Sequence, residues 1–149
     1  MKLFIDANIL VAVLNKEYPA FDCCARVLSL AGRPGFKLAC SSLSLGIAFY
    51  FCEKKNGRTE ALRRIRKLTD YIAISPCGEN EVKAAFEYKN VDFEDAMQEA
   101  SAKSGKSDLI ITLDYSDFWF SKIPVWHPED FLLRYLPEFN KKTYTADKQ

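Results

Sequence analysis

Several features that indicate common functions are missing from this sequence of 149 residues. It contains one histidine, and its five cysteines include no C-x-x-C pair, so neither a zinc-type ligand set nor a dithiol redox motif is indicated. No apolar run approaches the roughly 20 residues that a membrane-spanning helix needs. The net charge is only +1, which excludes a uniformly basic nucleic-acid binder and leaves room for local charged patches.

The cysteines and the N-terminus predict a reduced, cytoplasmic protein. The number of cysteines is odd, and unpaired cysteines ordinarily serve as small buried apolar side chains. The charged and apolar segments at the N-terminus are too short for a signal peptide.

Apolar runs without polar alternation predict a parallel sheet that is buried on both faces. The runs cover residues 2–5, 36–40, 71–75 and 108–112, with a weaker fifth at 122–126. Helical patterns separate them, at residues 7–15, 20–31, 43–55, 58–69, 79–88, 93–104 and 128–135. This alternation is typical of a doubly wound α/β domain, expected here over residues 1–136. Periodicity is lost from Pro137, so residues 137–149 are predicted to form a C-terminal tail.

Two of the expected helices have unusual compositions. Residues 43–55 are apolar on nearly every side, which predicts a central helix with its aromatic residues in the core. Residues 58–69 form a basic amphipathic pattern that includes Arg63, Arg64 and Lys67. This basic face is either a solvated surface with helix-supporting charge pairs or a surface that grips phosphates.

Acidic residues follow the ends of the expected strands, where open parallel sheets bind ligands. Asp6 follows the first strand, and Asp114 follows the fourth. Asp92 and Asp95 lie at the start of the helix that leads into the fourth strand. If the first and fourth strands are neighbours, Asp6, Asp95 and Asp114 converge at one rim of the sheet.

Such a convergence predicts a divalent metal site. Carboxylates without nearby Lys or Arg repel one another, and Mg²⁺ prefers oxygen ligands, binding through one or two carboxylates together with water and phosphate oxygens. A cation held in this way polarises a phosphoryl oxygen and activates water, so the chemistry indicates phosphodiester hydrolysis.

Each acid also has a purely structural explanation. Asp6 and Asp92 are suitable N-caps for the helices that follow them, and Asp114 could cap the turn YSDF. An aspartyl-phosphate enzyme, which also places an Asp after its first strand, is less well matched because position 8 is Asn rather than a second Asp. The agreement of three acids on one rim favours the metal site.

The segments FIDANIL, DFEDAMQEASA and LIITLDYSDF resemble, in order and spacing, the successive acidic motifs of the PIN domain family. The resemblance extends from residue 2 to about 135. It implies a three-layer α/β/α sandwich with a central parallel sheet of strand order 3-2-1-4-5. It further implies a ribonuclease that uses Mg²⁺ or Mn²⁺ to cleave single-stranded RNA, in many members as the toxin of a toxin–antitoxin pair, and often as a homodimer.

The resemblance also assigns roles to individual residues. Asp6, Asp95 and Asp114 match the metal-binding catalytic acids, while Asn8 and Thr112 match polar neighbours of the site. Asp117 matches a turn residue with a structural role. We expect the substrate to be contacted by Asn8, Ser42, Thr112, Arg63, Arg64 and Lys67.

One family feature is absent. Many members carry a Glu early in the third helix, but the matching segment SSLSLGIAFYF contains no acid at the expected place, Gly46 or Ile47. We expect Asp92 to replace it as a metal ligand, because Asp92 can share a helical face with Asp95 whereas Glu94 would point elsewhere. The alternative is a catalytically degenerate PIN-like module that binds RNA or protein without cleavage.

Overall fold

The computed structural model describes residues 1–136 and 138, and these residues contain a five-stranded parallel sheet of order β3-β2-β1-β4-β5. The strands are β1 (Lys2–Ile5), β2 (Lys37–Ser41), β3 (Ala73–Ser75), β4 (Leu109–Ile111) and β5 (Val125–Trp126). Phe4 at the centre of the sheet pairs with Ala39 of β2 on one side and with Ile110 of β4 on the other. The predicted strand order is therefore confirmed, and β1 and β4 are neighbours.

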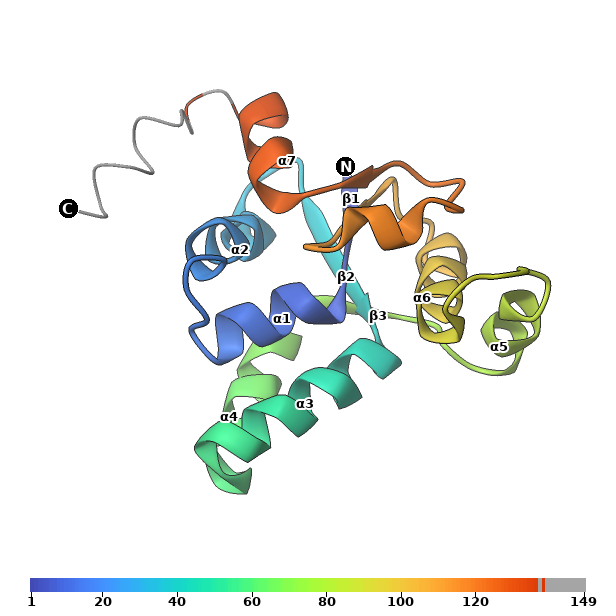
Figure 1. Ribbon diagram of the computed structural model, residues 1–149. Coiled ribbons are helices and arrows are strands. Elements are labelled where there is room, and N and C mark those ends of the chain that lie inside the picture. The colour runs from blue at the N-terminus through green and yellow to red at the C-terminus, as the bar shows by residue number, and fades with distance from the viewer. Residues whose placement is uncertain (137, 139–149) are drawn as a thin grey trace.

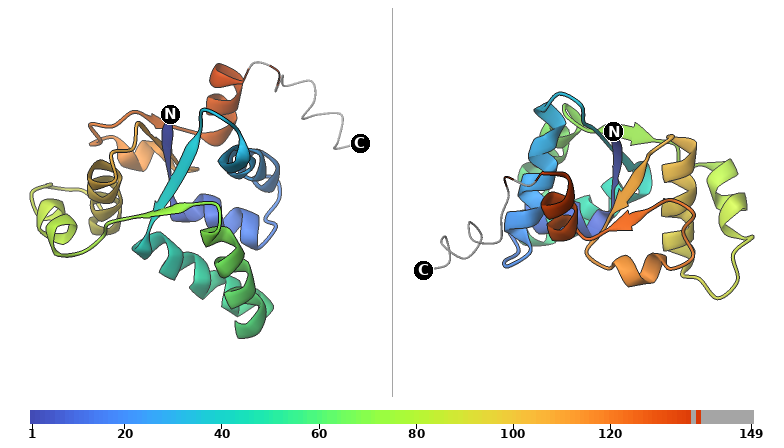
Figure 2. Two further views of the ribbon diagram at one scale, coloured as in Figure 1. Left: turned by 180° about the vertical axis from the view of Figure 1, so that it is seen from behind. Right: turned by 90° about the horizontal axis from the view of Figure 1, so that it is seen from above.

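Helices cover both faces of this sheet (Figures 1 and 2). They are α1 (Ala7–Leu14), α2 (Phe21–Leu28), α3 (Ser42–Asn56), α4 (Arg58–Thr69), α5 (Glu79–Ala85), α6 (Phe93–Ser104) and α7 (Pro128–Tyr135), with short 3-10 helices η1 (Ser29–Gly32) and η2 (Tyr115–Phe118). One face carries α1, α2, α3, α4 and α7, and the other carries α6, on which α5 packs. The three-layer α/β/α sandwich is thus confirmed. The predicted C-terminal tail, residues 137–149, lies outside the described residues except for Glu138.

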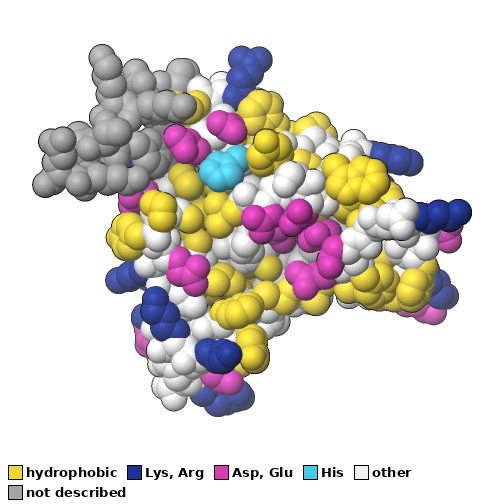
Figure 3. Space-filling model, viewed as in Figure 1, with side chains coloured by type: hydrophobic (Ala, Val, Ile, Leu, Met, Phe, Trp, Pro, Cys, Tyr) yellow, Lys and Arg dark blue, Asp and Glu magenta, His cyan; other side chains and the backbone are white. Residues whose placement is uncertain are grey.

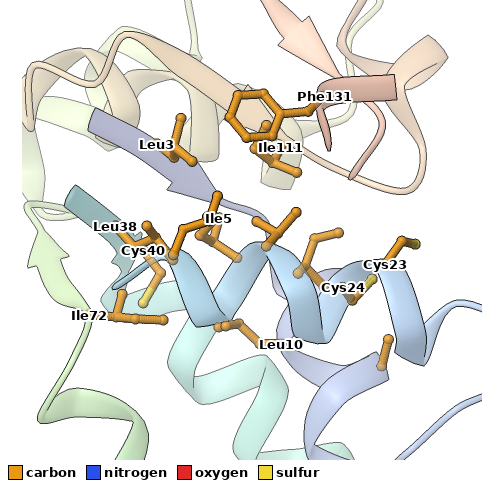
Figure 4. Packing of buried hydrophobic residues seen from close by; sticks show 14 of the residues in the cluster. Leu3, Ile5, Leu10, Cys23, Cys24, Leu38, Cys40, Ile72, Ile111 and Phe131 are labelled. Carbon is orange, nitrogen blue, oxygen red and sulfur yellow. The ribbon is translucent and has the colours of Figure 1, made fainter. Parts of the chain in front are cut away.

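Strand residues alternate between the two cores. Leu3 and Ile5 of β1 point toward α1, α2 and α7, where they pack with Ile111 and Phe131 (Figure 4). Phe4 points to the opposite face and packs with Ile110, Ala102 and Phe118. Full burial of such side chains contributes about 1.5–3 kcal/mol each relative to exposure. Four cysteines, Cys23, Cys24, Cys40 and Cys52, are buried, and Cys77 is half-buried, so the prediction of free thiols in apolar surroundings is confirmed for these four.

The prediction of a central α3 is wrong. Ala48 and Cys52 of α3 are fully buried against α1 and α4, but Tyr50 and Phe51 are 55% and 46% exposed. An apolar pattern that runs all round a helix does not reveal which side lacks a neighbour. The strand at residues 73–75 likewise lies at the sheet edge, and its Ile74 is exposed rather than buried on both faces.

A buried carboxylate fixes the middle of α6 relative to the segments around it. Glu99 is fully buried and accepts hydrogen bonds from the Tyr88 hydroxyl at 2.6 Å and from the Lys122 backbone N–H at 3.0 Å. The Lys103 ammonium lies 3.0 Å from the same carboxylate. Because a buried charge is stable only when it is paired and hydrogen-bonded, these three groups explain why Glu99 is tolerated in the core.

No helix among the described residues has the length and apolar character needed to cross a bilayer.

Candidate active site

Acidic side chains from four segments of the chain surround one cavity at the carboxyl ends of β1 and β4. The cavity has a volume of about 370 Å³, and its acids are Asp6, Glu17, Glu94, Asp95, Asp114 and Asp117. None of the described residues that line it is a Lys or an Arg. Figure 3 shows Asp and Glu side chains gathered between α1, η2 and the start of α6. The convergence of Asp6, Asp95 and Asp114 predicted from the sequence is therefore present.

Asp6 is held rigidly between β1 and α1. One of its carboxylate oxygens accepts a hydrogen bond from the Ala7 backbone N–H at 2.7 Å, and the other accepts one from the Thr112 hydroxyl at 2.8 Å. Asp6 thus caps α1 and faces the cavity at the same time, so the structural and functional explanations of this residue are compatible. Burial raises the pKa of Asp6 to about 6, although the Thr112 hydrogen bond acts in the opposite direction.

A network of polar side chains fixes Asp114 at the end of β4. The Asn8 side-chain amide donates to the Thr112 hydroxyl at 3.1 Å and to the Asp114 carboxylate at 3.3 Å. The side-chain oxygen of Asn8, Oδ1, accepts a hydrogen bond from the Leu113 backbone N–H at 3.2 Å. Asn8 and Thr112 therefore tie the turn after β4 to α1, which is a positioning role for two residues that the sequence placed beside the site.

The first turn of α6 presents different acids than the sequence predicted. Asp92 is the N-cap, its carboxylate accepting a hydrogen bond from the Asp95 backbone N–H at 3.1 Å, and it does not line the cavity. Glu94 does line it, so the expectation that Glu94 points elsewhere is wrong. Burial and then the neighbouring charge of Asp6 raise the pKa of Asp95 to about 7, and burial also raises the pKa of Glu94. Burial is thus the main cause of the raised pKa of Asp95, and the neighbouring acids add to it.

The wall opposite α6 is apolar. Ile47 and Phe51 of α3 line the cavity there, and no acid of α3 is among the lining residues. Glu53 of α3 instead pairs with Arg58, at 3.6 Å. The position where the sequence lacks the expected Glu therefore does face the cavity, and Ile47 occupies it.

A family model for the PIN domain matches residues 2–116 of this chain. The chain belongs to the PIN domain family. A comparison with curated proteins finds no match.

Solved PIN-type structures share the fold. VapBC-1 from nontypeable Haemophilus influenzae matches with a TM-score of 0.66 and 17% sequence identity, over 86% of this chain and 98% of that one. VapBC2 from Rickettsia felis, solved with a DNA fragment from its promoter, matches with a TM-score of 0.64 and 15% identity, over 85% and 98%. VapC20 from Mycobacterium tuberculosis, described as a Sarcin-Ricin loop cleaving toxin, matches with a TM-score of 0.62 and 16% identity, over 81% and 98%.

The cavity of this PIN domain offers the oxygen ligands that a hard divalent cation prefers. Among the described residues, no three acidic, His or Cys side chains already lie close enough to form a complete ligand set. Mg²⁺ does not require one, because it keeps several waters and binds through one or two carboxylates. Among the described residues that line the cavity, no Lys or Arg lies beside the acids, and burial raises the pKa of both Asp6 and Asp95. The donor set therefore fits Mg²⁺ or Mn²⁺, with Asp6, Glu94, Asp95 and Asp114 as the residues that would hold it.

The predicted basic residues do not reach this cavity. Arg63, Arg64 and Lys67 line a separate groove of about 500 Å³ beside Leu14, at the opposite end of α1 from Asp6. Arg63 and Arg64 both pair with Glu60, at 2.6 and 2.8 Å, and the Arg64 guanidinium also donates to the Leu14 carbonyl oxygen. Arg64 thus caps the C-terminal end of α1, so the structural explanation applies to it. Ser42, also predicted to contact substrate, lines another hollow that adjoins the acidic cavity.

Three acids line the cavity that the sequence does not predict there. The resemblance gives Asp117 a structural role, the helical spacing directs Glu94 elsewhere, and no motif includes Glu17. The YSDF turn predicts the direction of Asp117, because a one-turn helix after Asp114 places Asp117 on the same side of the helix as Asp114. Glu17 lies in the irregular segment after α1, where no periodicity predicts the direction of a side chain.

Proposed function

We propose that this PIN domain is a metal-dependent endoribonuclease that hydrolyses phosphodiester bonds of single-stranded RNA. The observation that supports the proposal is the meeting of Asp6, Asp95 and Asp114, from three distant segments, in one cavity that no Lys or Arg among its described lining residues neutralises. Acids with a structural role usually have cationic or hydrogen-bonding partners, which lower the pKa of the carboxyl group. The pKa values of Asp95 and Glu94 are instead raised. Perturbed acids in a cleft are a recognised indication of a functional site.

The side chains have distinct roles in this proposal. Bound Mg²⁺ or Mn²⁺ supplies charge stabilisation at the scissile phosphate and lowers the pKa of a water molecule. Asp6, Glu94, Asp95 and Asp114 would hold this cation. Thr112 and the Ala7 N–H hold the Asp6 carboxylate in one orientation, and Asn8 holds Asp114. No side chain of the chain needs to act as a nucleophile.

The comparisons suggest a biological setting for such an activity. VapC20 is described as a toxin that cleaves the Sarcin-Ricin loop, and the VapBC structures are complexes of paired proteins. We therefore extend the proposal to a toxin of a toxin–antitoxin pair that acts in the cytoplasm and is restrained by a small antitoxin protein. Co-expression with the product of the neighbouring gene should suppress RNA cleavage, and cleavage unaffected by that product would contradict this extension.

A direct test uses purified protein, a panel of single-stranded RNAs of varied sequence, and Mg²⁺ or Mn²⁺. We expect endonucleolytic products that disappear on addition of EDTA. Asp6→Asn should abolish cleavage and leave the melting temperature unchanged or raised, because Asn is an equally good N-cap and removes a buried charge. Asp70→Asn, an exposed change at the end of α4, is the matched control and should retain full activity. RNA that stays intact in the presence of folded protein and metal would refute the nuclease.

A binding module without turnover is the second candidate, and Ile47 favours it, since it places a hydrocarbon where many relatives carry a metal-binding Glu. Calorimetric titration with Mn²⁺ separates the two functions. Heat of binding that is lost in Asp6→Asn supports the nuclease, and no binding at millimolar Mn²⁺ supports the module.

A further inference from the structure

A second hollow, of about 730 Å³, adjoins the acidic cavity along α3. Its walls include Ser42, Ile47, Tyr50 and Phe51 of α3, and Glu94 and Met97 of α6. Ile47, Phe51 and Glu94 line both spaces, so the two are continuous around these side chains. In Figure 3, hydrophobic side chains lie over α3 directly beside the acids. We call this hollow the aromatic subsite.

Two exposed rings line the aromatic subsite, and a cation outside its lining lies over one of them. The Tyr50 and Phe51 ring centroids lie 5.2 Å apart with the ring planes at 82° to one another. The Lys54 ammonium lies 5.3 Å from the centroid of the Tyr50 ring, and it is an exposed side chain. Exposed aromatic rings beside a cation are the combination on which proteins stack the bases and bind the phosphates of single-stranded nucleic acid.

We propose that the aromatic subsite binds the nucleobase of the nucleotide next to the scissile phosphate, by stacking on Tyr50. The inference rests on the proposed function, because it takes the phosphate of an RNA strand to lie at the acids. A phosphate placed there has its own sugar and base within reach of the adjoining hollow, whose floor is apolar. The Ser42 hydroxyl at the rim offers one hydrogen bond to a base edge, and Lys54 offers a charge to the next phosphate.

This arrangement explains why position 47 carries an isoleucine rather than a Glu. A Glu at this position would place a charge on the wall shared by the two spaces, where it would face the π surface of a bound base. Ile47 instead gives the subsite a continuous apolar wall with Phe51 and Met97. The absence of an acid at this place in α3 and the apolar wall of the base site both result from Ile47.

The experiment measures RNA binding without cleavage. Asp6→Asn protein, which should not cleave, is titrated, by fluorescence anisotropy, with a fluorescein-labelled single-stranded RNA and compared with the Asp6→Asn, Tyr50→Leu double variant. Leu keeps the apolar character of position 50 and removes the ring. Stacking of one base predicts affinity that is weaker by about fivefold to about a hundredfold in the double variant. Tyr18→Leu, on a tyrosine that is 67% exposed against 55% for Tyr50 and lines neither space, is the matched control and should bind as before.

An abasic scan locates the base. A series of RNAs, each lacking one base, should show one position at which removal weakens binding to the Tyr50 protein and has no further effect on the Tyr50→Leu protein. Such coupling identifies the pair in contact. Loss of affinity that is equal in both proteins at every position would overturn the proposal, as would unchanged affinity of the Tyr50→Leu protein.

Self-association is the competing use of the same surface. Sedimentation of the proteins tests it: if Tyr50→Leu converts a dimer to a monomer and leaves RNA affinity intact, the rings belong to a dimer interface and the base site is refuted. The results that would refute the aromatic subsite differ from those that would refute the nuclease function. Protein that binds RNA through Tyr50 but never cleaves it refutes the proposed function alone, whereas protein that cleaves RNA with no dependence of binding on Tyr50 refutes the subsite alone.

Discussion

The Thr112 hydroxyl donates a 2.8 Å hydrogen bond to the carboxylate of Asp6, joining the end of β4 to the end of β1 at the floor of the acidic cavity. Both residues are buried, and Thr112 also accepts hydrogen bonds from the Asn8 amide and the Asp114 backbone N–H. One hydroxyl therefore sets the positions of two of the acids that are proposed to bind metal.

Replacing this hydroxyl should impair metal binding more than folding. Thr112→Val keeps the shape of the side chain, removes the bond to Asp6 and leaves the Asn8 amide and the Asp114 N–H without this acceptor. We expect Mn²⁺ affinity or cleavage to fall by about 10- to 100-fold, as is usual for residues that orient metal ligands. The unfolding free energy should fall by about 1–3 kcal/mol. Mn²⁺ calorimetry and chemical denaturation measure both quantities, with Thr69→Val as control, and unchanged Mn²⁺ affinity would refute the positioning role.

Stability should depend on pH through Asp6 and Asp95 when metal is absent. Their folded pKa values, about 6 and about 7, lie above the ordinary value of 3.8, so the folded state binds protons more tightly than the unfolded state. The stability that these two groups contribute is therefore fully present below about pH 4 and is lost as the pH rises through about 6 and 7. For Asp6 alone the shift corresponds to about 3 kcal/mol at most.

Melting temperatures in EDTA from pH 4 to pH 8 measure this dependence. We expect a decline across that range, a flatter curve for Asp6→Asn, and recovery on addition of Mn²⁺ at pH 8 but not at pH 4. A melting temperature that rises between pH 5 and pH 8 in the absence of metal would contradict the burial of ionised acids in this cavity.

Substitutions of Glu94 and of Asp92 should differ in their effect on metal affinity. Glu94 lines the cavity, whereas Asp92 serves as the N-cap of α6. Glu94→Gln is therefore expected to weaken Mn²⁺ binding by about tenfold, roughly 1.4 kcal/mol, the scale of one charge near a divalent ion at the protein surface. Asp92→Asn preserves the cap and should change affinity little. The reverse order of effects would restore Asp92 as the ligand predicted from the sequence.

Restoring the acid that α3 lacks should strengthen metal binding at a cost in stability. Ile47→Glu places a carboxylate on the wall opposite Asp95, and the added attraction for Mn²⁺ should be roughly 1 kcal/mol or more, at least about fivefold in affinity. In EDTA the same variant should melt at a lower temperature, because it adds another negative charge to the cavity. Gly46→Glu is the control, since a side chain there meets no atom within 4 Å and Gly46 does not line the acidic cavity. Equal effects of the two variants would indicate long-range charge rather than ligation.

Much of the fold and part of the site follow from the sequence for identifiable reasons. Central strands are buried on both faces, so the runs at Leu3–Ile5 and Leu109–Ile111 are continuous and apolar, and the acids that follow them must share an edge because the strands are parallel. The alternation of strands and helices gives the layers. These relationships depend on local patterns and on topology alone.

The remaining features depend on contacts between distant segments. The carboxylate of Asp92 is engaged as the N-cap of α6, and Glu94 rather than Asp92 lines the cavity formed with the end of β1. The exposure of Tyr50 and Phe51 depends on the absence of a described element on that side of α3. Arg64 is recruited to α1 by the Leu14 carbonyl, fifty positions away in the chain. No periodicity in the sequence encodes any of these partners.

The way Asp6 is held limits how it can coordinate an ion. Each of its two carboxylate oxygens already accepts one hydrogen bond, from the Ala7 N–H and from the Thr112 hydroxyl. A carboxylate oxygen has two lone pairs, so each retains a single lone pair for an outside ligand. Asp6 could therefore offer a lone pair to a divalent ion without giving up either hydrogen bond, and the other ligands would come from the neighbouring acids of the cavity, from solvent and from a substrate.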